Sequence, residues 1–196
     1  MINRLLIIIF IYNSLLTTNL FSIEPDVFVQ STVNRASKLL SEDISKEEKI
    51  NQLKIIAKET VDIKGIGNYT LGSVRKILNK EEKKEYAVLF EKYFLKSFSS
   101  RLAEYTNPEI DVKGKEIIND NYTIVNSTLK ATAERPEIRI DWRIYTKDPE
   151  NLLIRDLIIE GLSLARTQKE EFASVLNSNN GNIQELFKTL RTFTNE

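Results

Sequence analysis

Apolar and polar positions alternate regularly along Ile138–Tyr145. Alternation with period two places the apolar side chains on one face of a β-strand. A polar turn that contains Pro149 follows, and the next run, Leu152–Ile159, is apolar except at Arg155 and Asp156. That run predicts a second strand, with apolar side chains on both faces. The apolar positions that alternate in the first strand are Ile138, Ile140, Trp142 and Ile144.

Two more strands are expected before these, from Ile110 to Ile118 and from Tyr122 to Ala133, with polar turns at 119–121 and 134–136. The four strands follow one another with short connections. Parallel strands need long crossovers, so short connections favour an antiparallel meander.

Helical spacing precedes and follows the strands. Helices are expected over Glu24–Leu40, from Ser45, from Ser163 to Leu176 and after Asn182. Ser45 with Glu48, and Asn182 with Glu185, have the spacing of helix N-terminal caps. The glycines at 65, 67 and 72 are expected to break the intervening chain into short helical pieces.

The longest helical pattern covers Asn79–Tyr105, with Asn79 as its N-cap and Pro108 just beyond its end. An ordinary core stripe and the wall of an acyl-chain pocket use the same residue types, so the pattern is compatible with both. The stripe comprises Tyr86, Leu89, Phe90, Tyr93, Phe94, Ser97, Phe98, Leu102 and Tyr105.

Helices, then strands, then helices is the order of an α+β fold. The sequence predicts a four-stranded antiparallel sheet wrapped by N-terminal and C-terminal helices. Such an arrangement leaves room for a cavity between the sheet and the helices.

Residues 1–22 have the pattern of a secretory signal, with Arg4, an apolar run over Leu5–Tyr12 and a polar segment at 17–22. The run is too short to span a bilayer, which takes roughly 20 apolar residues. We therefore expect cleavage after Ser22 and a single exported domain over 23–196. An uncleaved N-terminal anchor is the alternative.

Composition excludes several kinds of chemistry. The chain has no His and no Cys, which excludes Ser-His-Asp and Cys-His sites, histidine metal sites and disulfides. Its 28 basic and 28 acidic residues balance, which argues against nucleic acid as a partner. Carboxylate chemistry remains, with Asp156 and Glu160 four positions apart on one predicted strand face. We expect Asp156 to order the sheet or a helix end, and a carboxylate hydrolase is the weakest of the functional hypotheses.

The chain resembles the MlaC family, periplasmic phospholipid-binding proteins that are auxiliary to toluene-tolerance ABC transporters. Two blocks of residues carry this resemblance, and it extends from about Val27 to Leu190. The first block contains Trp142-Arg143, Asp156, Glu160-Gly161-Leu162-Ser163 and Glu171-Phe172, and the second contains Val61-Asp62, Tyr69-Thr70-Leu71-Gly72 and Asn79-Lys80-Glu81-Glu82 leading to Phe90.

The resemblance implies a helix-wrapped sheet close to the NTF2-like and cystatin-like folds. It also implies a periplasmic carrier that is not an enzyme, needs no cofactor and takes a diacyl glycerophospholipid as cargo. Its expected partners are an outer-membrane lipoprotein complex and an inner-membrane ABC transporter complex. The alternative is an envelope protein-binding module of the same fold with a filled core and no lipid.

For a carrier, the acyl chains are expected between the sheet and the aromatic helix. The candidate lipid-binding residues are Phe90, Phe94, Val125, Leu129, Ile138, Ile140, Trp142, Ile144, Leu157, Ile159, Leu164 and Phe172.

Overall fold

The computed structural model describes residues 23–195, so the predicted signal at 1–22 lies outside the described residues. The helices are α1 (Pro25–Ser41), α2 (Lys46–Thr60), α3 (Ile63–Thr70), the 3₁₀ helix η1 (Gly72–Lys76), α4 (Lys80–Leu102), α5 (Leu164–Ser178) and α6 (Ile183–Thr194). The strands are β1 (Ile110–Asn119), β2 (Tyr122–Leu129), β3 (Ile138–Tyr145), β4 (Leu153–Ile159) and β5 (Leu162–Ser163).

The sheet is antiparallel throughout, in the order β1-β2-β3-β4-β5. The α+β prediction is confirmed, but the sheet has five strands and not the four that we expected. The extra strand is β5, whose two residues pair with Ile158 and Ile159. Glu160 and Gly161 both have positive φ (49° and 83°), which lets a two-residue turn reverse the chain here.

The predicted strand over Tyr122–Ala133 ends earlier than expected, at Leu129. Beyond it Thr132 and Arg135 pair with each other in an isolated bridge. Residues 130–135 therefore form a local turn and do not continue the strand. The β-propensity of this stretch does not predict that turn.

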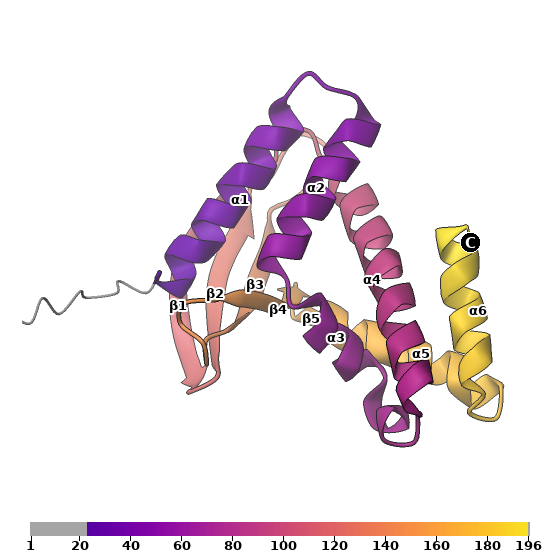
Figure 1. Cartoon of the computed structure of the whole chain (residues 1–196). Helices are drawn as coiled ribbons and strands as arrows, with labels where there is room; N and C mark the ends of the chain where they lie inside the picture. Colours follow the sequence, from indigo (N-terminus) through magenta and orange to yellow (C-terminus); the bar gives the residue numbers. More distant parts are fainter. Residues whose placement is uncertain (1–22, 196) are drawn as a thin grey trace, which may run out of the picture.

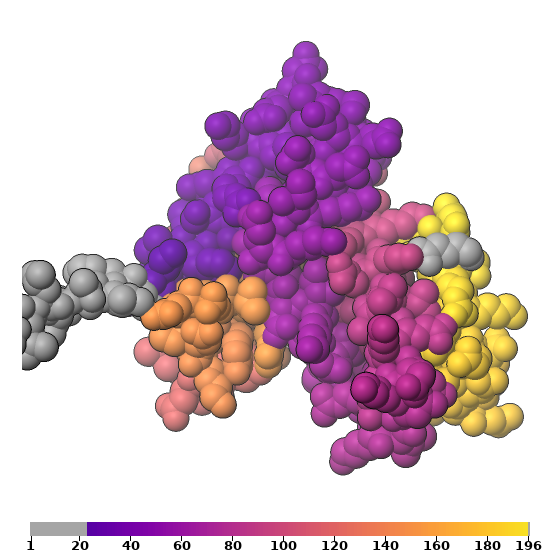
Figure 2. Space-filling view, in the orientation of Figure 1, coloured from indigo at the N-terminus to yellow at the C-terminus, as the bar shows by residue number. Residues whose placement is uncertain are grey.

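The helices cover one face of the sheet. Helix α1 packs on β1 and β2, α5 packs on β4, and α4 lies between α2 and α6. Figure 1 shows α1 and α2 as a hairpin in front of the sheet, and in Figure 2 this hairpin hides most of the sheet from view. Along β2 and β3 buried and partly exposed residues alternate, as the period of two predicts.

Side-chain caps start the helices where the sequence predicts them. The Ser45 hydroxyl accepts from the Glu48 backbone N–H. Asn79 and Glu82 form a complete capping box at the start of α4. Among the residues described, no helix combines the length and the apolar character that crossing a membrane requires.

Two of the three glycines expected to break the chain do not do so. Gly65 and Gly67 lie inside α3, and only Gly72, with φ of 57°, follows the end of that helix. A Cβ at Gly67 would lie 2.7 Å from a ring carbon of Phe90. The close approach of α3 to α4 therefore explains why a residue without a side chain occupies position 67.

A β-bulge at Arg155 shapes the strand β4. Asp156 pairs with Arg143, but the next pair is Ile154 with Ile144, so Arg155 has no partner of its own in β3. The Arg155 Nε donates to the Asp62 carboxylate at 2.5 Å. The bulge lets Ile154 and Leu157, three positions apart, face the same helices.

Candidate functional site

An apolar cavity with a polar rim lies between α4, α5 and the sheet. We call it the rim cavity, and its volume is about 200 Å³. One face of α4 and one face of α5 line it, at the spacing of successive helical turns. The α4 and α5 residues are Phe90, Tyr93, Phe94, Ser97, Phe98, Arg101, Leu164, Ala165, Thr167, Gln168 and Glu171, and the remaining walls are Val61, Ile66, Trp142, Ile154, Asp156 and Leu157.

A second cavity, the deep cavity, lies under the α1–α2 hairpin and has a volume of about 140 Å³. Its walls are almost entirely apolar. They come from α1 and α2 (Thr32, Val33, Ala36, Ser37, Leu40, Leu53, Ile56, Thr60), from the end of α4 and the loop after it (Leu102, Tyr105, Pro108), from the sheet (Ile110, Leu129, Ile140, Ile159), and from five residues shared with the rim cavity.

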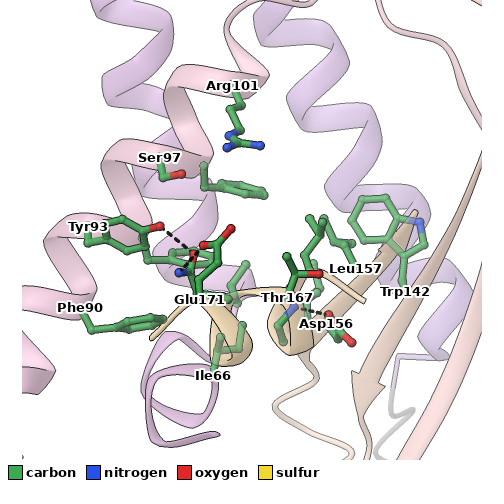
Figure 3. Close-up of a pocket in the computed structure, with 17 residues that line it drawn as sticks. Ile66, Phe90, Tyr93, Ser97, Arg101, Trp142, Asp156, Leu157, Thr167 and Glu171 are labelled. Carbon is green, nitrogen blue, oxygen red and sulfur yellow. Dashed lines mark hydrogen bonds between the residues drawn. The ribbon is translucent and has the colours of Figure 1, made fainter. Parts of the chain in front are cut away.

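The five shared residues separate the two cavities: Val61, Phe98, Trp142, Ile154 and Leu157. Figure 3 shows Trp142 and Leu157 on the side of the space opposite to the α4 side chains. The Trp142 indole N–H donates to the Ser127 hydroxyl at 2.8 Å, which fixes the ring against the sheet. The two cavities therefore adjoin across one apolar wall, and we call them together the apolar tract, which extends from a polar rim to a region under α1 and α2.

The structure places eight of the twelve candidate lipid-binding residues on this tract. Phe90, Phe94 and Leu164 line the rim cavity, Leu129, Ile140 and Ile159 line the deep cavity, and Trp142 and Leu157 line both.

The other four candidates, Val125, Ile138, Ile144 and Phe172, line neither cavity. Val125 and Ile144 are fully buried in the core, and Ile138 packs partly buried against it. Phe172 is enclosed by aromatic rings, with Tyr86 and Phe90 in edge-on contact.

Several lining residues were not among the candidates. The α2 residues Leu53 and Ile56 belong to a helical stripe of apolar positions, and Phe98 belongs to the aromatic stripe of α4. Ile154 could not be found from alternation, because the bulge at Arg155 changes the face on which it lies.

A hydrogen-bonded chain of side chains crosses the rim. The Tyr93 hydroxyl donates to Gln168 Oε1 at 2.7 Å, and Gln168 Nε2 donates to the Glu171 carboxylate at 2.9 Å. Burial raises the pKa of Tyr93, and the nearby Glu171 charge raises it further. Tyr93 is therefore a neutral hydrogen-bond donor at the rim.

Asp156 is buried and orders the start of α5, as we expected of it. Its carboxylate accepts from the Ser163 hydroxyl at 2.6 Å and from the Ala165 backbone N–H at 3.0 Å. A guanidinium nitrogen of Arg143 lies 3.5 Å away. A carboxylate is favoured here because the N-terminus of a helix carries partial positive charge.

Asp156 and Glu160 do not share a strand face, contrary to the sequence interpretation. Glu160 lies in the turn beyond β4, and its carboxylate accepts from the Arg139 backbone N–H. With Asp156 engaged at α5, the two do not form a paired acid site. The described residues also hold no group of three or more potential metal-ligating side chains.

A wider surface hollow of about 830 Å³ lies beside α3 and shares Val61 and Phe90 with the rim cavity. Lys58, Lys64, Lys83 and Lys84 are among its lining residues. Charged walls of this kind do not suit hydrocarbon, so the hollow does not extend the tract.

Comparison with known protein families gives a match over residues 30–192 to the family described as MlaC protein. The chain belongs to the MlaC family. A comparison with curated proteins gives no match.

Among solved structures, this MlaC-family chain is similar to a phospholipid-binding protein from Ralstonia solanacearum, whose structure is a complex with a phospholipid. The two share 19% sequence identity with a TM-score of 0.73, and the match covers 88% of this chain and 97% of that one. This likeness confirms the fold.

Proposed function

We propose that this protein is a periplasmic phospholipid carrier of an Mla-type transport system. It holds acyl chains in the apolar tract, with the headgroup at the polar rim near Arg101 and Glu171. The observation that carries the proposal is that the rim and deep cavities adjoin across a shared apolar wall, which includes Trp142 and Leu157. Membership of the MlaC family and the phospholipid bound to the Ralstonia protein support it.

The energetics fit a carrier. Burying hydrocarbon contributes about 0.8 kcal/mol per CH₂, whether the surroundings are a bilayer or an apolar cavity. Moving a lipid from a membrane into the tract is then close to isoenergetic. The direction of lipid transport must therefore be set by partner proteins. As partners we propose an outer-membrane lipoprotein complex and an inner-membrane ABC transporter complex.

A protein-binding module with a filled core would not need the cavities. Close-packed interiors contain few voids larger than a water molecule, and unfilled apolar space destabilises a fold. The two cavities of about 200 and 140 Å³ therefore favour a protein that accommodates a ligand.

Blocking the tract tests the function. Ser97 lines the rim cavity from α4, and we expect Ser97→Trp to fill that space with an indole ring. Transfer of a fluorescent phospholipid from donor to acceptor vesicles should fall several-fold, with the melting temperature of the empty protein kept or raised. The matched control is Ser100→Trp, one helical turn further along α4 and outside both cavities.

Ser100→Trp should transfer lipid like the wild type. Equal transfer by Ser97→Trp and the wild type would contradict the proposal, as would a wild-type protein that transfers no lipid.

A further inference from the structure

Two opposite charges face the same space at the rim. Arg101 extends from the last turn of α4, and Glu171 extends from α5. Both line the rim cavity, and in Figure 3 the guanidinium and the carboxylate point toward the open space between the two helices. Both side chains belong to exposed residues, so a ligand can reach them from solvent.

Neither charge neutralises the other. Within residues 23–195 the Arg101 guanidinium has no hydrogen-bond or ion-pair partner, whereas Arg143 pairs with Asp156 and Arg166 with Glu170. Yet both charges act on the hydroxyl of Tyr93. Beyond the effect of burial, Glu171 raises the pKa of Tyr93 and Arg101 lowers it. The two charges and the Tyr93 hydroxyl therefore belong to the same part of the rim cavity, near enough for both charges to act on that hydroxyl.

The carboxylate of Glu171 is held in place before any ligand arrives. Gln168 donates to its Oε2, and Tyr93 in turn fixes Gln168. Its Oε1 accepts no hydrogen bond from the described residues, which leaves that oxygen to accept from a ligand.

We propose that Arg101 and Glu171 together recognise a zwitterionic headgroup, so that the protein prefers phosphoethanolamine lipids to phosphoglycerol lipids. Arg101 binds the phosphate, because a guanidinium presents paired N–H donors to phosphate oxygens. Glu171 binds the ammonium group, which a two-carbon linker holds close to that phosphate. The inference rests on the proposed function, since it assigns the headgroup of the same cargo.

A phosphoglycerol headgroup can make only one of these two charged contacts. Its phosphate meets Arg101, but its glycerol hydroxyls bring no positive charge to Glu171. Glu171 then repels the phosphate across the rim. Because both groups are exposed, the discrimination is that of a surface ion pair, about two- to five-fold.

Competitive loading tests the preference. Lipid-free protein is incubated with vesicles that contain equal amounts of phosphatidylethanolamine and phosphatidylglycerol with identical acyl chains, and the lipid on the re-isolated protein is quantified by mass spectrometry. The wild type should carry about two to five times more phosphatidylethanolamine. Glu171→Gln should carry the two in equal amounts. High salt should weaken the wild-type preference, since it screens exposed charges.

Two further variants test whether the preference depends on the Glu171 charge itself and not on any nearby carboxylate or on phosphate binding. The control is Glu170→Gln, whose exposed carboxylate pairs with Arg166 away from the rim, and it should keep the wild-type ratio. Arg101→Gln should lower loading of both lipids by a similar factor, because both carry the phosphate.

The outcomes distinguish the two proposals. A wild type that takes up neither lipid would refute the proposed carrier function. A wild type that takes up both lipids in equal amounts would overturn the headgroup inference alone. A Glu171→Gln variant that keeps the wild-type ratio, or loses both lipids equally, would overturn it too.

Discussion

Trp142 on β3 and Leu157 on β4 are direct cross-strand partners, and both side chains line the rim cavity and the deep cavity. Side chains directly opposite each other on antiparallel strands lie in contact on one face of the sheet. This pair therefore forms the floor at which the two cavities meet. A change here affects the whole apolar tract.

Leu157→Glu should empty the tract and leave the fold in place. A buried unpaired carboxylate costs several kcal/mol beside hydrocarbon, and much less beside water in an emptied cavity. The variant should lose its lipid while its melting temperature falls little, as measured by lipid extraction and thermal unfolding of the same sample. The matched control is Ile158→Glu on the neighbouring position of β4, which lines neither cavity.

The filled-core alternative makes the opposite forecast for Leu157→Glu, because a solid core admits no water. A variant that unfolds outright would support that alternative. A variant that keeps both its lipid and its stability would show that Leu157 does not contact the cargo.

Removing the Asp156 carboxylate should destabilise the protein. Asp156→Ala leaves the Ala165 N–H and the Ser163 hydroxyl without their acceptor, and removes the carboxylate that pairs with Arg143. We expect a loss on the order of 2–4 kcal/mol in the free energy of unfolding, measured with urea. Glu170→Ala, at an exposed ion pair on the same helix, should cost less than about 1 kcal/mol. Equal effects of the two substitutions would contradict the role assigned to Asp156.

Alkaline pH should destabilise the protein partly through Tyr86. Burial raises the pKa of Tyr86 above its ordinary value of 10.0. Above pH 10 the unfolded chain releases this proton while the folded chain retains it, so the free energy of unfolding falls as pH rises. Tyr86→Phe should show a shallower loss of stability between about pH 10 and 11, in urea unfolding at several pH values. At pH 7 it should lose about 1 kcal/mol, because its 2.8 Å hydrogen bond with Thr70 is gone. An unchanged alkaline slope would contradict this reading.

Gly67→Ala should disturb the aromatic wall of the tract. The added methyl group would lie 2.7 Å from Phe90, so the ring has to move. We expect a cost of about 1–3 kcal/mol and reduced lipid loading. Gly114→Ala on β1 is the control, because a Cβ there meets nothing within 4 Å. A Gly67→Ala protein as stable and as well loaded as the control would remove Phe90 from the proposed wall.

The inner face of β3 could be predicted from the sequence because alternation of side chains is a local property of a strand. Ile140, Trp142 and Ile144 are all buried, as the pattern indicates. The pattern could not tell which of them would line a cavity. That depends on where the helices approach the sheet, and Ile144 is covered completely while Trp142 is not.

The bulge in β4 could not be predicted from local pattern. Arg155 leaves the strand register and pairs with Asp62, which lies 93 positions earlier in the chain.

The two charged residues proposed to bind the headgroup, Arg101 and Glu171, could not be predicted from the sequence pattern either. Arg101 lies on the same face of α4 as Phe98, one turn further along the helix. Because the stripe was defined by apolar side chains, this charged residue was not among its members.

The most direct test of the account is the lipid content of the protein as the cell makes it. The protein is expressed with residues 1–22, isolated from the periplasm without detergent, and examined by native mass spectrometry together with lipid extraction. The account predicts a species heavier than the polypeptide by the mass of a diacyl phospholipid, which disappears in Leu157→Glu and persists in Ile158→Glu. A protein that is found only without lipid, and that takes up none from vesicles, would contradict it.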